Sequence, residues 1–215
     1  MANATRATGS DRTYGQYCPI AVGLDAIGDR WTLLICRELA LGDRRFTDLR
    51  HGLTGIAPNL LSDRLRALQA AGLVTSVELP PPAARSVYRL TDDGRRVIPV
   101  LRALARFGVQ HLEGPPTPSF TAQRAANVLL AAWWRGDGQD QHVRLSFGED
   151  SADLWVEAGR IRVDAPQGDP DLTVHTTAAD LVAARQGEAL VATFQGPAAR
   201  RSAFLERFDL RWAKR

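Results

Sequence analysis

Residues 57–70 combine an amide, a hydroxyl, a carboxylate and a guanidinium at a spacing that suits one face of a helix. At about 100° per residue, the polar side chains lie opposite the bulky apolar ones. The polar face comprises Asn59, Ser62, Asp63 and Arg66, and the apolar face comprises Ala57, Leu61, Leu65 and Leu68. These polar groups can form hydrogen bonds with base edges in the major groove of DNA, which admits a helix. The competing interpretation is a solvated helix face without a partner.

Two segments with strand-like alternation follow this helix, over residues 73–79 and 86–91. The sequence PPPAAR between them predicts a stiff, exposed turn that ends in Arg85. In a hairpin at this place, Arg85, and with it Arg89, can reach phosphates or the minor groove. For Arg85 the alternative is an ordinary surface charge.

The chain before this helix predicts a small helical scaffold. Pro19 suits a first helical turn, and Asp29 suits the N-cap of a helix over residues 30–41 that Gly42 ends. A shorter helix is expected over residues 47–51. Apolar residues at helical spacing predict a core stripe in the longer helix, made of Trp31, Leu34, Ile35 and Leu39.

After the hairpin, Thr91 or Asp92 can cap a helix over residues 94–112, which Pro99 should bend or restart. One narrow face of this helix carries Arg95, Arg102 and Arg106. The apolar residues spread over an arc of about 140°, which one small domain cannot easily cover. Part of this band is therefore expected to meet a second subunit. The band comprises Val97, Val100, Leu101, Leu104, Phe107 and Leu112.

Charge is distributed unevenly along the chain. Residues 1–112 carry 15 arginines and 10 acidic residues, whereas residues 113–215 carry 12 basic and 14 acidic residues, in agreement with the formal net charge of +3. The positive excess thus accompanies the helix and the hairpin, as binding to a phosphate backbone requires. Solvated surfaces are often equally asymmetric, so the charge supports a nucleic-acid partner without establishing one.

Composition changes at a Pro-rich linker over residues 113–120. The sequence beyond it predicts an α+β unit over residues 121–215. The expected elements are an Ala-rich helix (121–135), strands (142–148, 152–159, 160–166 and 171–177), a helix (178–187), a short strand (191–196) and a closing helix (197–208). Trp133, Trp134, Trp155 and Phe147 are candidates to line a ligand pocket there, with core packing as the alternative.

Several classes of function find no support in the sequence. Cys18, Cys36 and the four histidines lack metal-ligand spacing, and phosphate-binding loops and nucleophile elbows are missing, so we expect no catalytic residue, metal or cofactor. No apolar run approaches the roughly 20 residues of a membrane span. Residues 1–16 predict a flexible polar tail without a hydrophobic signal segment. A cytoplasmic protein without a membrane partner is the default expectation.

Residues 17–112 resemble the HxlR-type winged helix-turn-helix regulators, which are relatives of the MarR class. The resemblance rests on the motifs WTLLI, RRFTDL and LxxRLxxLxxAGLV, followed by YRLTDDGRRVIPVLRALARFG. It implies a homodimer with two recognition helices that binds a palindromic operator in double-stranded DNA. A Cys-Pro near the start is typical of the family, and in some members this cysteine senses oxidants or electrophiles. Cys18 matches that position, and simple packing is the alternative for it. The family often has Ser where this chain has Ala57 at the helix N-cap.

Residues 121–208 resemble sterol-carrier-protein-like domains through VExGRIRV, DPDLTVHTTAADL and the order of the expected elements. The resemblance implies a pocket for apolar ligands between a sheet and helices. We therefore expect an α+β protein that is a dimeric DNA-binding regulator controlled by a small apolar or aromatic effector. One alternative is a lipid- or small-molecule-binding protein whose winged domain serves only assembly. Another is a redox-sensing regulator that acts through Cys18.

Overall fold

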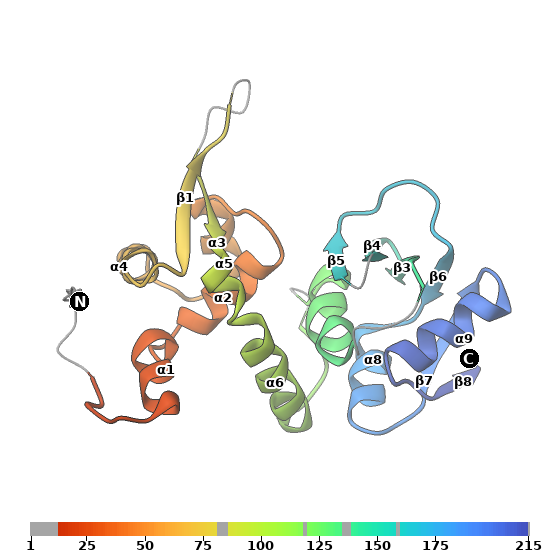
Figure 1. Ribbon diagram of the computed structural model, residues 1–215. Coiled ribbons are helices and arrows are strands. Elements are labelled where there is room, and N and C mark those ends of the chain that lie inside the picture. Colours follow the sequence, from red (N-terminus) through yellow and green to blue (C-terminus); the bar gives the residue numbers. More distant parts are fainter. Residues whose placement is uncertain (1–12, 81–85, 118–119, 135–138, 158–159, 215) are drawn as a thin grey trace. The chain divides into compact units, whose positions relative to one another are not determined.

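The computed structural model describes residues 13–80, 86–117, 120–134, 139–157 and 160–214 (Figure 1). The chain divides into two compact units, Met1–Pro99 and Val100–Arg215. The first unit is mostly helical with one β-hairpin, and the second combines helices with a six-stranded sheet. The expected α+β class is thus confirmed.

The first unit follows the expected order of elements. Strands β1 and β2 pair antiparallel with Val74 opposite Leu90, and Arg44 adds an isolated bridge to Tyr88. The leucines of α2, α3 and α4 form the core together with residues of the hairpin. The elements are α1 (Pro19–Ile27), α2 (Thr32–Ala40), α3 (Phe46–Gly52), α4 (Pro58–Ala70), β1 (Val74–Glu78), β2 (Ser86–Leu90) and α5 (Asp92–Arg95).

The start of α2 differs from the expectation. Trp31, not Asp29, is the N-cap residue, and its backbone lies in the left-handed region with φ 79°. The helix begins at Thr32 because this conformation interrupts the helical path. Ile35 and Leu39 are buried as expected, but Leu34 is 40% exposed, so its assignment to the core was wrong.

The single helix expected over residues 94–112 is divided. Thr91 caps α5 by accepting a hydrogen bond from the Gly94 N–H (3.0 Å). The chain then starts again as α6 (Ile98–Gly108), which the 3₁₀ turn η1 (Val109–His111) follows. Pro99 lies in the first turn of α6, where its missing N–H is not needed. Proline therefore restarts the helix, as the sequence indicated.

The second unit contains a sheet of order β5-β4-β3-β6-β7-β8. β3, β4 and β5 form an antiparallel meander, β6 runs parallel to β3, and β8 runs parallel to β7. The core lies between this sheet and the helices. The elements are α7 (Ala122–Ala125), η2 (Ala126–Leu130), η3 (Ala131–Trp133), β3 (Gln141–Phe147), β4 (Asp150–Glu157), β5 (Arg160–Asp164), β6 (Leu172–His175), α8 (Ala178–Arg185), β7 (Leu190–Gln195), α9 (Ala198–Arg207) and β8 (Trp212–Lys214).

Two features of this unit were not anticipated. The helix expected over residues 121–135 changes from α-helical (α7) to a π-helical turn (η2) and then to a 3₁₀ turn (η3). Strand β8 was missed because three residues are too few to show alternation. Among the described residues, no helix has the length and apolar character needed to cross a bilayer.

The segment after Pro99 packs with the second unit. Val109 is 2% exposed within the core of that unit. The Arg106 side chain donates to the Ala132 carbonyl (2.8 Å), and the Arg102 guanidinium lies 5.9 Å from the ring centroid of Trp134. The division between units therefore precedes the linker over residues 113–120 that marked the boundary in the sequence.

Candidate functional site

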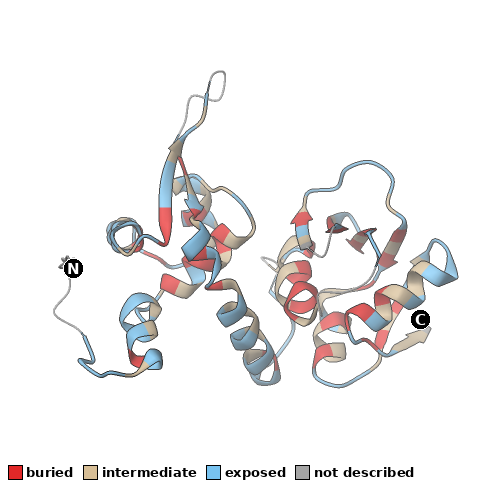
Figure 2. Ribbon diagram, in the orientation of Figure 1, coloured by how far each residue is buried: buried red, intermediate tan, exposed pale blue. Residues whose placement is uncertain are grey.

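Helix α4 separates an apolar face from a polar one. Leu61, Leu65 and Leu68 are at most 1% exposed and anchor the helix in the first unit. Asn59, Asp63 and Arg66 are exposed, and Ser62 is half-buried. Figure 2 shows the exposed side of this helix as pale blue ribbon. The packing of three leucines thus decides which side chains of α4 face outward. Ala57, expected on the apolar face, is instead the exposed N-cap residue.

Two local features hold the start and the middle of α4. Its N-cap residue, Ala57, provides no side-chain hydrogen bond, and Pro58 fills the first helical position. The Arg64 guanidinium lies 2.7 Å from the carboxylate of Asp29, which precedes α2. Arg64 therefore serves the scaffold and is not part of the outward polar face.

The polar face of α4 is organised by interactions within the helix. The Ser62 hydroxyl donates to the carbonyl of Pro58 (3.1 Å), and its oxygen can still accept a hydrogen bond. Arg66 forms an ion pair with Asp63, one turn away. Because both side chains are more than half exposed, this pair is weak and can open when a stronger partner approaches.

The two arginines that the sequence singled out in the hairpin beside α4, Arg85 and Arg89, have different outcomes. Arg85 lies outside the described residues. Arg89 donates from Nε to Asp43 (2.8 Å), in the loop between α2 and α3. Hydrogen bonding and charge from Arg89 hold the pKa of Asp43 below its ordinary value. Arg89 therefore fixes the base of the hairpin to the scaffold.

A close backbone contact also sets the position of the hairpin. A Cβ atom on Gly94 would lie 1.9 Å from the carbonyl oxygen of Leu73, the residue before β1. The Thr91 hydroxyl donates to the carbonyl of Gly72 (2.6 Å). Helix α5 thus lies directly against the turn between α4 and β1, and the glycine is required because any side chain would force the two apart.

The two cysteines have different surroundings. Cys18 is partly exposed and is the N-cap residue of α1, without a side-chain capping bond. Cys36 is completely buried in α2, and burial raises the pKa of its thiol to about 11. Cys36 is thus an unreactive core residue, and of the two only Cys18 is accessible.

The four aromatic candidates of the second unit do not gather in one place. Trp133 lines a cavity of about 450 Å³, together with residues of α8, α9 and the segments after them. Phe147 packs against the core, and Trp134 lies near Arg102 of α6. The ring of Trp155 stacks on His142 with 3.6 Å between centroids, and Arg162 lies 5.5 Å from its centroid.

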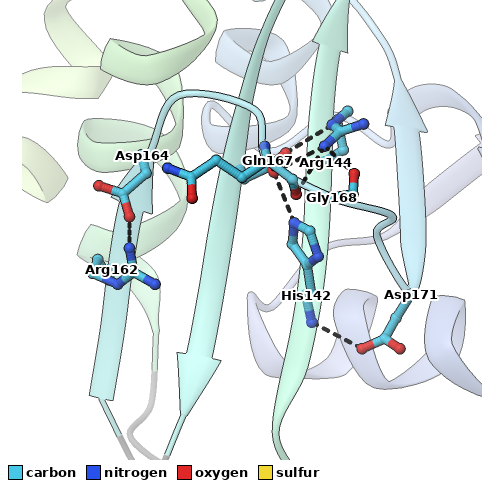
Figure 3. A network of polar contacts seen from close by, with 8 residues as sticks. His142, Arg144, Arg162, Asp164, Gln167, Gly168 and Asp171 are labelled. Atoms are coloured by element: carbon cyan, nitrogen blue, oxygen red, sulfur yellow. Dashed lines mark hydrogen bonds and ion pairs between the residues drawn. The ribbon is translucent and has the colours of Figure 1, made fainter.

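A polar network lies on the strands beside this stack (Figure 3). Asp153 is completely buried and accepts hydrogen bonds from Arg144 (2.8 and 2.9 Å) and from the backbone N–H of Gln167 (2.7 Å). Nε2 of His142 lies 2.8 Å from the same carboxylate. Burial by itself raises the pKa of Asp153. The hydrogen bonds lower the pKa by more than burial raises it, so it lies below its ordinary value. This network anchors the segment between β5 and β6.

Sequence reasoning missed Arg185, a buried arginine that lines the cavity. Arg185, at the end of α8, is 6% exposed and lies over the ring of Trp133 (4.5 Å to the centroid). Its sequence context, AARQGE, is that of an ordinary solvated helix end. Among the described residues, no group of three or more His, Cys, Asp or Glu side chains could hold a metal ion.

The comparisons with known proteins each concern less than half of the chain. The HxlR-like helix-turn-helix family matches residues 26–115. An "uncharacterized HTH-type transcriptional regulator" of Mycobacterium tuberculosis is 43% identical over 96 residues, which are 43% of this chain and 60% of that protein. A protein of the same description from Synechocystis is 36% identical over 99 residues, 46% of this chain and 73% of that protein. The chain thus spans less than two thirds of its mycobacterial relatives.

Among solved structures, the redox regulator HypR in its oxidised form is similar to this chain. It is 27% identical, with a TM-score of 0.42, over 45% of this chain and all of that one. The reduced transcriptional regulator YodB from Bacillus subtilis is 25% identical, with a TM-score of 0.40, over 47% of this chain and all of that one.

These relatives carry the names of transcriptional regulators and not of enzymes. The family matches the segment that contains the α4 helix and the β1–β2 hairpin. The chain belongs to the HxlR-like helix-turn-helix family.

Proposed function

We propose that this protein is a dimeric, sequence-specific DNA-binding transcriptional regulator. The observation that carries the proposal is the outward polar face of α4, held by three buried leucines next to an antiparallel hairpin. A helix of this kind presents its side chains to base edges in the major groove, and a neighbouring hairpin contacts the backbone or the minor groove. The residues that would contact bases are Asn59, Ser62, Asp63 and Arg66. Arg85 would contact the phosphate backbone of the DNA.

Family membership supports this assignment, because the HxlR-like helix-turn-helix family matches the segment that holds α4 and the hairpin, and relatives are named as HTH-type transcriptional regulators. Asp63 would have a second role, since it holds the Arg66 guanidinium in place until DNA replaces it as partner. Arg89 is paired with Asp43 and would position the hairpin instead of contacting DNA directly.

Dimerisation is supported by two helices that expose apolar side chains. Helix α1 exposes Ile20, Val22 and Leu24, at 44–74%. Helix α6 exposes Val100, Leu104 and Phe107, at 44–67%, while its Arg102 and Arg106 face the second unit. Exposed apolar patches of this kind commonly mark interfaces between subunits. We propose that these faces pair two copies, which then bind a palindromic operator with half-sites about one helical turn apart.

We further propose that the second unit is a sterol-carrier-protein-like domain that binds a small effector. A sheet covered by helices and a cavity that contains Trp133 support this assignment. An effector can control operator binding only if its affinity differs between the free and the DNA-bound protein. The cavity also supports the alternative of a small-molecule-binding protein whose winged domain serves only assembly.

The test is a gel-shift and footprinting titration of the full chain against the DNA upstream of its own gene. Arg66→Ala should weaken specific binding by about 1–3 kcal/mol if Arg66 contacts a base. Arg96→Ala is the matched control, because Arg96 is also largely exposed and pairs with Asp93 in the same i,i+3 geometry, but lies outside the polar face of α4. A footprint that Arg66→Ala leaves unchanged would reject the assigned face. Ligand binding without operator binding would favour the alternative.

A further inference from the structure

The cavity of the second unit contains a buried cation that lacks a full set of partners. Arg185 donates from Nε to the Leu129 carbonyl (2.5 Å) and from Nη1 to the carbonyls of Phe208 (2.8 Å) and Asp209 (3.5 Å). Its Nη2 atom is buried and has no hydrogen-bond partner among the described residues. The whole side chain is more than nine-tenths buried. Arg185 is also one of the residues that line the cavity, so its unused donor lies directly behind the cavity wall.

The partners of Arg185 accept its hydrogen bonds but do not neutralise its charge. The atoms that accept its hydrogen bonds are neutral carbonyls from the ends of η2 and α9. Burial accordingly lowers the pKa of the guanidinium to about 9, although the charge of Asp209 raises it. A buried charge that only neutral carbonyls contact directly is incompletely compensated by the charge of Asp209, and an anion that reaches it recovers part of the free energy lost on burial.

The remaining lining of the cavity restricts the kind of anion. Trp133, Ala184, Leu205 and Leu210 provide apolar surface. Glu188, Glu206 and Asp209 are exposed carboxylates of the lining, and Arg211 adds a second, exposed cation. These carboxylates repel a ligand with several charges, such as a phosphate ester. A ligand with a single negative charge meets less repulsion and can place its apolar part against Trp133 and Leu205. The cavity volume of about 450 Å³ is that of a site for small organic molecules.

We propose that this cavity binds a small monocarboxylic acid with an apolar body, whose carboxylate pairs with Arg185. This inference rests on the proposed function and specifies the chemical class of its effector. The apolar body packs beside Trp133, and the guanidinium turns toward the cavity so that the carboxylate accepts the unused hydrogen bond of Nη2.

The cavity wall is also bonded directly to the segment that follows α6. The Gln186 side chain donates from Nε2 to the carbonyls of Val109 (3.0 Å) and Leu112 (3.1 Å). The Gln110 side chain donates in return to the carbonyl of Arg185 (3.0 Å). A ligand that displaces the backbone at the end of α8 therefore acts on the segment after α6, the helix whose apolar face is proposed to pair two copies.

The test uses titration calorimetry on the full chain without DNA, so a failure of operator binding cannot affect it. The probes are 2-naphthoate and octanoate, which distinguish an aromatic from a linear body, with 2-naphthamide and octanamide as uncharged counterparts. At least one acid should bind, and about 10- to 100-fold more tightly than its amide, as a hydrogen bond to a charged group provides. Naphthyl phosphate should bind more weakly than naphthoate.

Three variants locate the site. Arg185→Gln should reduce the affinity for the acid to that for the amide, and circular dichroism establishes whether it is folded. If this variant does not fold, Leu205→Trp serves instead, because it fills the cavity from a half-buried position and should abolish binding of acid and amide alike. Arg162→Gln is the matched control, because this exposed arginine of β5 does not line the cavity, and it should change the affinity by less than about threefold, since exposed ion pairs contribute little.

The proposal is overturned if neither acid binds at millimolar concentration, or if acid and amide bind equally. It is also overturned if the Arg185→Gln protein binds the acid as tightly as the parent protein does, or if the Leu205→Trp protein binds the acid normally. Operator binding measured on the same preparations tests the proposed function separately.

Discussion

Arg89 and Asp43 join the base of the hairpin to the loop between α2 and α3, with 2.8 Å between Nε and the carboxylate. The next residue along that loop, Arg44, forms a backbone bridge with Tyr88 of β2. The hairpin is thus held by a side-chain pair and a backbone pair at adjacent positions. Its direction relative to α4 depends on both.

The ion pair predicts a specific pH dependence of stability. Because Arg89 lowers the pKa of Asp43, the folded state is favoured above the ordinary carboxyl pKa, and this stabilisation is lost as the pH falls through the lowered value. Asp43→Asn should lower the melting temperature slightly at pH 7, by an amount that disappears in acid. Thermal melts of both proteins between pH 7 and pH 2 test this. A difference between the two proteins that persists or grows in acid would contradict it.

Gly94→Ala should destabilise the first unit strongly, since the added Cβ would lie 1.9 Å from the Leu73 carbonyl oxygen. Overpacking against backbone commonly costs about 1–3 kcal/mol, and this contact is closer than most. Urea denaturation measures the loss. Arg95→Ala, at the neighbouring exposed position of α5, is the control and should stay within about 0.5 kcal/mol of the parent protein. Equal effects of the two substitutions would show that the close approach is not restrictive.

Phe107→Asp should separate the proposed dimer, because it places a charge in the exposed apolar face of α6. Sedimentation or light scattering should then show a monomer, and operator affinity should fall with it. Ser202→Asp, at an exposed position of α9, adds the same charge elsewhere and should leave the assembly unchanged. A parent protein that is already monomeric at micromolar concentration would refute the pairing of α6 faces.

Gln186→Ala should separate effector binding from its consequence. The substitution removes the hydrogen bonds to the carbonyls of Val109 and Leu112 but no residue of the cavity lining. We expect the carboxylic acid to bind as it does to the parent protein, while its effect on operator affinity becomes smaller. Calorimetry and gel shifts on the same variant test this. An unchanged effect on operator affinity would show that the signal takes another path.

The redox alternative makes a separate prediction about Cys18, the accessible cysteine of the two. If the regulator senses oxidants through this thiol, Cys18→Ser should retain DNA on treatment with diamide while the parent protein releases it. Cys36→Ala should not prevent the release of DNA, since the Cys36 thiol is buried and its raised pKa keeps it protonated and unreactive. Equal release of DNA by parent and Cys18→Ser proteins would remove the redox alternative.

Local pattern was sufficient for most of the first unit. The leucine spacing of α4 defined its buried face, and alternation defined β1 and β2, because both signals depend on residues close together in the chain. The same reasoning placed Leu34 in the core, where burial depends on what packs above it and not on periodicity. The same reasoning also could not show that Arg89 forms an ion pair with Asp43, since the two residues are 46 positions apart in the chain.

The sequence by itself therefore determined the helix-turn-helix with its outward polar face and the restart of the helix next to Pro99. Only the tertiary structure decided that the arginines of α6 face the second unit, and that Arg185 is buried over Trp133. Those contacts join segments far apart in the chain. An arginine buried by such contacts has the same local sequence pattern as one in water.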